Sequence, residues 1–344
     1  MKTKNFTTRR GKVLPMTQFG LGSAPLGDLY AKLDERVSFE TVVQARTRGV
    51  GVFDTSPHYG NGLAEARFGI GLRGAERDTY VLSTKVGRVM DPFTRPAPPR
   101  SDVTAPGFAG GFPHAARFDY SYDGTMRSVE QSLLRLGTHR IDILLIHDVD
   151  VWTHGTAVDQ RFAEAMGGAY KALDRLRSEG TVAAIGIGVN EAEMCARFAA
   201  AGDFDLMMLA GRYTLLEHDA LDTFMRTATE RGIGILSAGV FNSGILATGA
   251  VPGAKYNYAP APERVLQRVR AIERVCQAHG VALPAAAMAF TAAHPAVACV
   301  VLGAVTPQEV DAQVALSGAS IPAALWSELR AEKLLRADAP VPQA

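Results

Sequence analysis

The sequence is poor in the residue types that mark several common classes of protein. It has only two tryptophans and three cysteines, and no cysteine is in a CxxC pair. We therefore expect the cysteines to be buried and reduced rather than part of a disulfide framework or a zinc site; they are Cys195, Cys276 and Cys299. No run of about 18 apolar residues occurs, so a membrane span is not expected.

The chain also lacks an excess of charge of either sign. Its 36 Lys and Arg residues nearly balance its 35 Asp and Glu residues, and a net charge of +1 gives no electrostatic support for binding nucleic acid. No apolar run of the kind that a secretory signal needs follows the basic residues 1–12. With 47% hydrophobic residues, we expect a cytoplasmic enzyme with one domain over residues 1–344.

Several functional motifs are missing or out of context. The sequence has no Walker loop, HExxH or GxSxG. Gly69, Gly71 and Gly74 match GxGxxG, but residues 63–73 are themselves predicted to be a helix, whereas a dinucleotide fingerprint needs a strand before it and a helix after it. Residues 147–154 hold two His and two Asp without a known metal-ligand spacing, so we expect polar loop residues there and no metal.

What the sequence does have is an alternation of short β-rich runs with helical patterns. Apolar residues recur at helical spacing over residues 126–136 and 265–276. Eight βα units without a linker favour a closed (β/α)8 barrel over a doubly wound sheet. The predicted strands are residues 17–21, 51–54, 79–85, 141–146, 182–188, 206–209, 234–237 and 297–302.

Two stretches are too long to be simple connections. Residues 88–122 are rich in proline and glycine, so no regular structure is expected there. The part before Gly107 is expected to be disordered, and the later, aromatic part to form a lid or pocket wall. Residues 239–262 follow the seventh strand and are expected to fold over a ligand.

Four side chains suited to proton chemistry lie at or just after predicted strands. Asp54 and Lys85 end two of them, His147 directly follows a third, and Tyr59 lies in a glycine-bounded loop after Asp54. Catalytic groups of (β/α)8 barrels lie at these carboxyl ends. A phenol with a pKa near ~10 is a poor base unless a cation such as Lys85 stabilises its phenolate. Asp54 would keep Lys85 charged, and His147 would hydrogen-bond a substrate oxygen.

These segments, in this order, resemble the aldo-keto reductase family along nearly the whole chain. The resemblance rests on GLG at 20–22, DTSPHYGNG at 54–62, STK at 83–85, SLLRLG at 132–137, IDILLIHD at 141–148 and Asn190. It implies an α/β fold, a (β/α)8 TIM barrel with an N-terminal β-hairpin (residues 6–15) closing the bottom and a nicotinamide cofactor over the top. It also implies a catalytic tetrad of Asp54, Tyr59, Lys85 and His147. A non-enzymatic nucleotide-binding module, as in potassium-channel β-subunits, is the alternative.

The resemblance also implies a cofactor site. Asn190 matches the residue that holds the carboxamide, although Val189 and Ala210 stand where serine and glutamine are common. Tyr213 matches the aromatic residue that stacks on nicotinamide, and residues 239–246 match the loop over the pyrophosphate. The expected cofactor-binding residues are Gly22, Ser23, Asp54, Asn190, Tyr213, Gly239, Val240, Phe241, Asn242, Ser243, Gly244, Leu246, Gly303, Val305, Thr306, Glu309 and Gln313.

The segment after the eighth strand predicts that NAD is preferred to NADP. NADP-preferring relatives carry basic residues about where Val305 and Thr306 stand, because a 2'-phosphate needs a cation. Neither residue supplies one. Glu309 or Gln308 could hydrogen-bond a free ribose hydroxyl instead, and a carboxylate there would repel phosphate.

Residues 24–30, 119–137 and 210–218 resemble the aldose 1-dehydrogenase branch of the family, which oxidises a cyclic hemiacetal to a lactone. We predict oxidation of an aldose of the L-fucose or D-threo-aldose type, with Tyr59 as proton acceptor. Pyridoxal oxidation is the first alternative, because aromatic walls also stack on a pyridine ring, and a general aldehyde or ketone reductase is the second. No oligomeric state is predicted. The expected substrate-lining residues are Tyr30, His58, Tyr59, Phe118, Tyr120, His147, Trp152 and His154.

Overall fold

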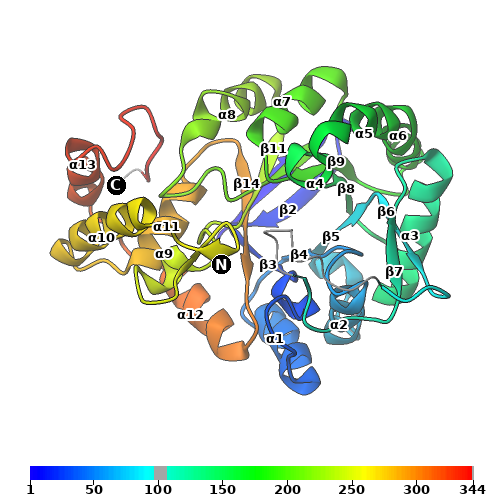
Figure 1. Ribbon diagram of the computed structural model, residues 1–344, viewed down its shortest axis with the longest axis horizontal. Coiled ribbons are helices and arrows are strands. Elements are labelled where there is room, and N and C mark those ends of the chain that lie inside the picture. Colours follow the sequence, from blue (N-terminus) through cyan, green and yellow to red (C-terminus); the bar gives the residue numbers. More distant parts are fainter. Residues whose placement is uncertain (97–106, 343–344) are drawn as a thin grey trace.

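The computed structural model describes residues 1–96 and 107–342, which contain a closed barrel of eight parallel strands surrounded by helices (Figure 1). Each strand pairs with the next along the chain, and β14 closes on β3. All eight predicted strands are confirmed to within two residues at each end. The barrel strands are β3 (Phe19–Gly22), β4 (Val52–Asp54), β5 (Val81–Val86), β8 (Ile143–His147), β9 (Ala184–Val189), β10 (Leu206–Ala210), β11 (Gly234–Ala238) and β14 (Val297–Gly303).

The helices form the outer layer, and the two periodic segments of the sequence are confirmed as α3 and α10. Helix α2 contains Gly69 and ends at Gly71, so the GxGxxG match lies at the end of a helix and is no dinucleotide fingerprint. The helices are α1 (Glu35–Thr47), α2 (Leu63–Gly71), α3 (Tyr122–Leu136), α4 (Val151–His154), α5 (Val158–Glu164), α6 (Tyr170–Ser178), α7 (Ala192–Ala201), α8 (Phe224–Arg231), α9 (Ile245–Thr248), α10 (Glu263–Ala278), α11 (Leu283–Ala292), α12 (Pro307–Ser317) and α13 (Ala323–Ala331).

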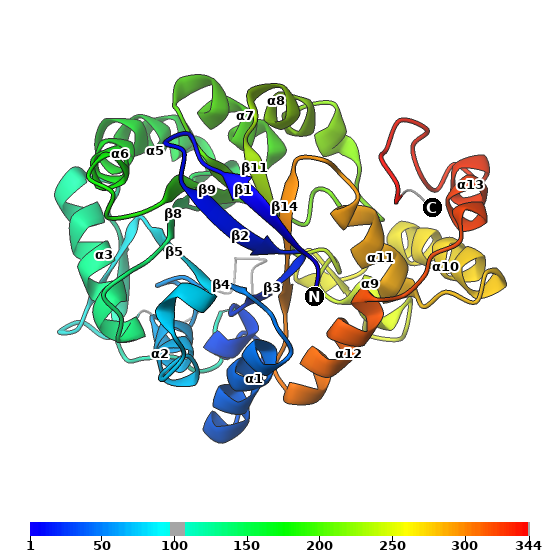
Figure 2. The ribbon, with the colours of Figure 1, turned by 180° about the vertical axis from the view of Figure 1, so that it is seen from behind.

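An N-terminal hairpin lies across one end of the barrel, as predicted (Figure 2). It consists of β1 (Thr3–Thr7) and β2 (Val13–Thr17), which pair antiparallel. Leu14 and Met16 of β2 pack into the same buried cluster as the inward-facing strand residues. The hairpin therefore closes the bottom of the barrel with apolar side chains and leaves the carboxyl ends of the strands for the site.

The prediction that residues 88–122 have no regular structure is wrong. Strand β6 (Arg88–Asp91) pairs antiparallel with β7 (Ala115–Phe118), beginning with Arg88 opposite Phe118. The reason is that two short segments separated by a long connection still satisfy each other's backbone groups. The expected disorder before Gly107 falls largely on residues 97–106, which lie outside the described residues.

The second long connection, residues 239–262, also folds locally. It forms α9 and a small hairpin of β12 (Lys255–Tyr256) and β13 (Ala259–Pro260). The three cysteines are free and buried, as predicted. In the described part of the chain no single helix is long and apolar enough to cross a membrane, although α10 and α11, bent by 97°, pass that test together by length and composition.

Candidate active site

The alternation of side chains along the strands decides where the polar strand ends point. Ile143 of β8 belongs to the buried cluster inside the barrel, and His147, four residues later, lies on the same face. Val52 of β4 is in that cluster too, and Asp54 follows it by two residues. Val81 of β5 also belongs to this cluster, and Lys85, four residues later, therefore lies on the inward face of β5. Three strands therefore direct their polar ends inward at the carboxyl end of the barrel.

Asp54 and Lys85 form a buried ion pair. Lys85 Nζ donates to Asp54 Oδ2 at 2.7 Å and to the carbonyl oxygen of Thr55 at 2.8 Å, while Ser83 Oγ donates to Asp54 Oδ1 at 2.8 Å. Burial alone would lower the pKa of Lys85, but Asp54 and Tyr59 outweigh it and raise that pKa. The ammonium is thus held charged, in one orientation.

The phenol of Tyr59 lies between this ion pair and His147. Lys85 Nζ is 4.8 Å from the centroid of the Tyr59 ring, and the rings of Tyr59 and His147 are 5.8 Å apart, edge to face. Burial raises the pKa of Tyr59 above its usual value of 10, and Lys85 opposes that rise. Lys85 therefore lowers the pKa of Tyr59, as the sequence predicts, but burial raises that pKa by more.

His147 is buried and neutral. Its Nδ1 lies 3.0 Å from Ser56 Oγ and 3.4 Å from Arg88 Nη1, and its Nε2 lies 3.2 Å from Asp148 Oδ1. Burial, together with the charges of Lys85 and Arg88, lowers the pKa of His147 well below 6.5. The group at this position is therefore a hydrogen-bonding imidazole and not a cation at neutral pH.

The structure separates the expected substrate-lining residues into three groups. His58 belongs with the tetrad, because its ring lies 6.1 Å from that of His147 and its Nδ1 is buried without a hydrogen-bond partner in the described part of the chain. Tyr120 is only 1% exposed; its hydroxyl donates to the His147 carbonyl oxygen at 2.8 Å and lies 3.0 Å from His154 Nε2. Tyr120 thus supports His147 and is too buried to line an open wall, which corrects the expectation for it. His154 is half-buried beside Tyr120, and its place in the substrate wall stays a prediction.

The remaining expected substrate-lining residues are partly exposed. Phe118 lies against the Arg88 guanidinium, whose carbon is 4.3 Å from the ring centroid. Tyr30 lies 4.0 Å from Lys255 Nζ of the β12–β13 hairpin, measured from its ring centroid. Trp152 is on α4, with its backbone N–H donated to Glu191.

Several residues near the tetrad are not anticipated by the sequence analysis. Arg88, Ser56 and Asp148 contact His147. In the sequence, the feature that could have identified them is their position just after a predicted strand. The Phe108 ring lies 5.3 Å from that of His58 and 6.2 Å from that of Tyr59, and no sequence signal separates it from other loop aromatics. Its loop is tied to the Tyr59 turn by a hydrogen bond from the N–H of Phe112 to the Gly60 carbonyl oxygen at 2.9 Å.

Tyr258 is a further unanticipated neighbour of this site. It lies in the turn between β12 and β13, and its backbone N–H donates to Ser243 Oγ at 2.9 Å. Burial raises the pKa of Tyr258 to about 12, and Tyr59 and Asp148 are among the groups whose charges act on it. The hydrogen bond to Ser243 ties the β12–β13 turn to the expected pyrophosphate loop.

Comparison with known proteins agrees with this geometry. A family model described as "Aldo/keto reductase family" matches residues 18–331. The chain belongs to the aldo/keto reductase family. It is 38% identical to a pyridoxal 4-dehydrogenase of Microbacterium luteolum and 35% identical to a D-threo-aldose 1-dehydrogenase of a Pseudomonas species, in both cases over 94% of this chain and 95% of the relative. An aldo-keto reductase of Bacillus halodurans in its holo form shares the fold, with a TM-score of 0.73 at 22% identity, covering 100% of this chain and 98% of that one.

As an aldo/keto reductase the protein is an oxidoreductase, and the family uses nicotinamide cofactors. The strand ends around the tetrad fit such a group. Ser23 Oγ after β3 and Thr55 Oγ1 after β4 are buried without a hydrogen-bond partner in residues 1–96 and 107–342, so polar contacts remain to be made there. Asn190 follows β9 and is half-buried. A Cβ at Gly22 would come within 2.8 Å of the Val301 side chain, so this close strand approach requires glycine.

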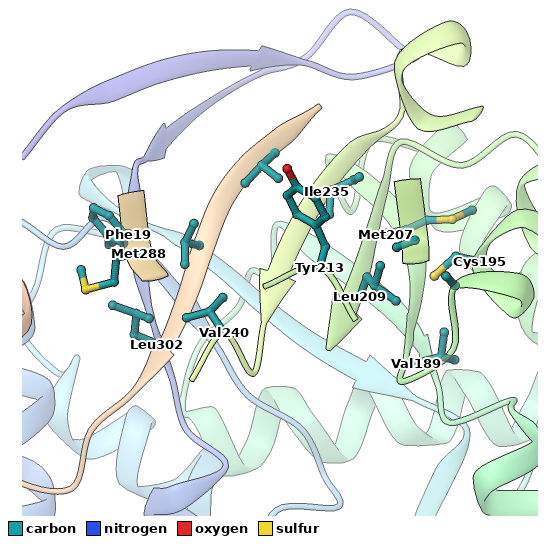
Figure 3. Close-up of a cluster of buried hydrophobic side chains, with 14 of the residues drawn as sticks. Phe19, Val189, Cys195, Met207, Leu209, Tyr213, Ile235, Val240, Met288 and Leu302 are labelled. Atoms are coloured by element: carbon teal, nitrogen blue, oxygen red, sulfur yellow. The ribbon is translucent and has the colours of Figure 1, made fainter. Parts of the chain in front are cut away.

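Tyr213 is not at this strand-end surface, and the prediction that it stacks on nicotinamide is wrong for this structure. It is 1% exposed and lies in the hydrophobic layer between strands and helices, with its ring 5.2 Å from Phe290 and 5.3 Å from His294 (Figure 3). The reason is that Tyr213 lies beyond β10 in a turn that folds back over the outside of the barrel. Its position in sequence does not reveal that direction.

The loop after β11 is held in place by hydrogen bonds between the Asn242 side chain and the segment after β10. Asn242 Oδ1 accepts a hydrogen bond from Thr214 Oγ1 at 2.6 Å, and Asn242 Nδ2 donates to the Gly211 carbonyl oxygen at 3.1 Å. Asn242 therefore helps to hold this loop in place, and its expected role in cofactor binding stays a prediction. Positive φ angles at Gly239, Asn242, Ser243 and Gly244 give the loop a tight turn. The other expected loop residues divide into Phe241, which is half-buried, and Val240 and Leu246, whose side chains are in the core.

The opposite end of the expected cofactor site is the start of α12. Thr306 is its N-cap, accepting a hydrogen bond from the backbone N–H of Glu309 at 3.2 Å. The Glu309 carboxylate turns back to accept from the backbone N–H of Val305 at 2.8 Å. Gln313 Nε2 donates to the Gly303 carbonyl oxygen at 2.8 Å. A carboxylate thus occupies the position where a helix N-terminus would otherwise attract an anion.

Proposed function

We propose that the protein is an NAD-dependent dehydrogenase that oxidises the hemiacetal carbon of an aldose to a lactone. The observation that carries this proposal is the Tyr59 phenol set between the charged Lys85 and the neutral His147. Tyr59 accepts the hydroxyl proton, Lys85 stabilises the resulting phenolate, and His147 orients the substrate oxygen. The nicotinamide supplies the hydride acceptor.

The relatives support a cyclic hemiacetal as the reacting group. The names of the two relatives that share 35–38% identity describe an aldose 1-dehydrogenase and a pyridoxal 4-dehydrogenase. Polar side chains, including those of Asp148 and His58, lie beside His147 and suit a sugar with several hydroxyls. We therefore favour an aldose.

Pyridoxal is the second candidate, and one feature favours it. The rings of Phe108, His58 and Tyr59 lie within 6.3 Å of one another, and flat rings stack on a pyridine. The 38% identity to a pyridoxal 4-dehydrogenase supports the same candidate.

The start of α12 supports NAD over NADP. The Glu309 carboxylate lies at this helix N-terminus, and neither Val305 nor Thr306 can supply a cation for a 2'-phosphate. A second negative charge would be repelled there. A higher kcat/KM with NADP⁺ than with NAD⁺ would contradict this preference.

The test is an absorbance assay of NADH formation with NAD⁺ and a panel of L-fucose, D-arabinose, L-galactose and pyridoxal, alongside NADPH oxidation with simple aldehydes. We expect turnover of at least one sugar. Turnover of pyridoxal without any sugar would replace the aldose proposal by the second candidate. Nucleotide binding without turnover of any compound would indicate a binding module.

A further inference from the structure

Three charged or polar side chains form a closed arrangement at the carboxyl end of β8. Arg88 Nη2 is 2.8 Å from Asp148 Oδ2, Asp148 Oδ1 is 3.2 Å from His147 Nε2, and Arg88 Nη1 is 3.4 Å from His147 Nδ1. All three are largely buried, with side-chain exposures of 7% for Arg88, 14% for Asp148 and 9% for His147. These side-chain contacts are additional to the backbone pairing of β5, β8 and β9.

The contacts assign the proton of the neutral His147 ring to Nε2. A guanidinium only donates, so Arg88 requires a lone pair on Nδ1. Ser56 Oγ, 3.0 Å from the same Nδ1, already accepts from the backbone N–H of His58 at 3.1 Å and has its own proton free to donate. On the other side of the ring, the Asp148 carboxylate only accepts. Nε2–H is therefore donated to Asp148 as the structure stands.

Asp148 is held in this position by its backbone conformation and by its hydrogen-bonded partners. Its φ angle is +55°, in the left-handed region that residues other than glycine seldom adopt. Its backbone N–H donates to the Gly188 carbonyl oxygen at 3.0 Å, and the Arg88 guanidinium that binds its carboxylate is covered by the Phe118 ring. The carboxylate therefore points at the same imidazole nitrogen that a substrate oxygen would use.

We propose that Asp148 is a specificity-determining residue that accepts a hydrogen bond from the substrate hydroxyl next to the reacting carbon. This inference rests on the function proposed above. Neighbouring oxygens on a sugar ring are about as far apart as a hydrogen-bonded pair, which is also the separation of Asp148 Oδ1 and His147 Nε2. A sugar whose reacting oxygen meets Nε2 thus brings its neighbouring hydroxyl to Asp148. That hydroxyl satisfies the carboxylate and leaves Nε2–H for the reacting oxygen.

The proposal separates classes of substrate by chemistry. An aldose with a hydroxyl at carbon 2 offers Asp148 a donor. A 2-deoxy sugar or a simple aldehyde offers none, so His147 stays bound to Asp148. Pyridoxal places a phenolic oxygen beside its hemiacetal carbon, and when that oxygen is ionised it is repelled by the carboxylate.

The experiment compares kcat/KM for two matched pairs of sugars, D-arabinose with 2-deoxy-D-ribose and L-fucose with 2-deoxy-L-fucose. We expect the wild-type enzyme to prefer the sugar with the 2-hydroxyl by about 10- to 100-fold, the effect of one hydrogen bond to a charged group. Asp148→Asn should reduce that preference to a few-fold, mainly by loss on the hydroxylated sugar. Arg88→Lys keeps the positive charge but cannot contact Asp148 and His147 with two separate nitrogens as Arg88 does. This variant should therefore give an intermediate preference.

Asp159→Asn is the matched control, because it removes a carboxylate that pairs with Arg197 on the surface, and it should keep the wild-type preference. Nucleotide binding, followed by quenching of protein fluorescence, shows that each variant is folded. Equal turnover of the two sugars of a pair by the wild type, or an unchanged preference in folded Asp148→Asn, overturns this inference and leaves the proposed function standing. Turnover of pyridoxal without any sugar overturns both.

Discussion

Tyr59 is the residue on which the proposed chemistry depends, and two opposing effects set its pKa. Burial disfavours the charged phenolate, whereas the Lys85 ammonium favours it. Because burial prevails, the pKa of Tyr59 lies above that of a free phenol. Oxidation needs the phenolate form, so its rate should rise towards alkaline pH.

Removing either group should change turnover in a distinguishable way. Tyr59→Phe should lower kcat by roughly a hundred- to ten-thousandfold because the proton acceptor is lost, while the nucleotide Kd changes little. Lys85→Met should move the alkaline rise of kcat to still higher pH, because the one contribution that lowers the pKa of Tyr59 disappears. Profiles of kcat against pH check both. If the rise of kcat in Lys85→Met occurred at the same pH as in the wild type, a group other than Tyr59 would be responsible for it.

At the scale of elements, the ends of strands and helices carry the functional groups, and α12 shows how a helix start can select a cofactor. The carboxylate of Glu309 satisfies a backbone N–H before the helix and opposes the positive end of its dipole. The same carboxylate that stabilises α12 is therefore expected to repel a 2'-phosphate.

Glu309→Gln keeps the capping geometry and removes the charge, so we expect the ratio of kcat/KM for NADP⁺ to that for NAD⁺ to rise by about three- to tenfold. Glu263→Gln is the control, because Glu263 lies in the first turn of α10, which is not a predicted part of the cofactor site. Initial rates with both nucleotides measure the ratio. A ratio that stays at the wild-type value would remove Glu309 from the account of cofactor preference.

At the scale of the whole molecule, burial of neutral histidines ties stability to pH. Burial lowers the pKa of His218 and of His294 from 6.5 to about 4. Between these values the unfolded chain binds a proton that the folded protein does not. The stability that each histidine contributes is therefore complete above pH 6.5 and is lost as the pH falls towards 4.

For each such histidine the free energy of unfolding should fall by about 1.4 kcal/mol per pH unit within that range. His294→Gln should remove one of these contributions and give a shallower dependence, because glutamine can still accept the backbone N–H of Ala296 that His294 Nδ1 accepts at 3.2 Å. Urea unfolding at pH 7.5, 6 and 5 compares the two proteins. If the free energy of unfolding fell equally steeply with pH in both proteins, His294 would not be one of the histidines that tie stability to pH.

The sequence by itself determined the eight barrel strands and the placement of Asp54, Lys85 and His147 at their carboxyl ends. Those features depend on local periodicity: side chains alternate along a strand, and a polar residue that ends a β-rich run stays at that end in any parallel barrel. The helices predicted at residues 63–73, 126–136 and 265–276 follow from the same kind of local pattern.

Tertiary structure alone decided the contacts between segments that lie far apart in the chain. It paired β6 with β7, turned Tyr213 into the core, placed Phe108 against His58, and joined Arg88 to Asp148 across 60 residues of sequence. Each outcome depends on which faces pack together and on which buried charges find a partner. Local pattern fixes where a side chain sits along its own element, whereas the partner that it meets is set only when the barrel closes.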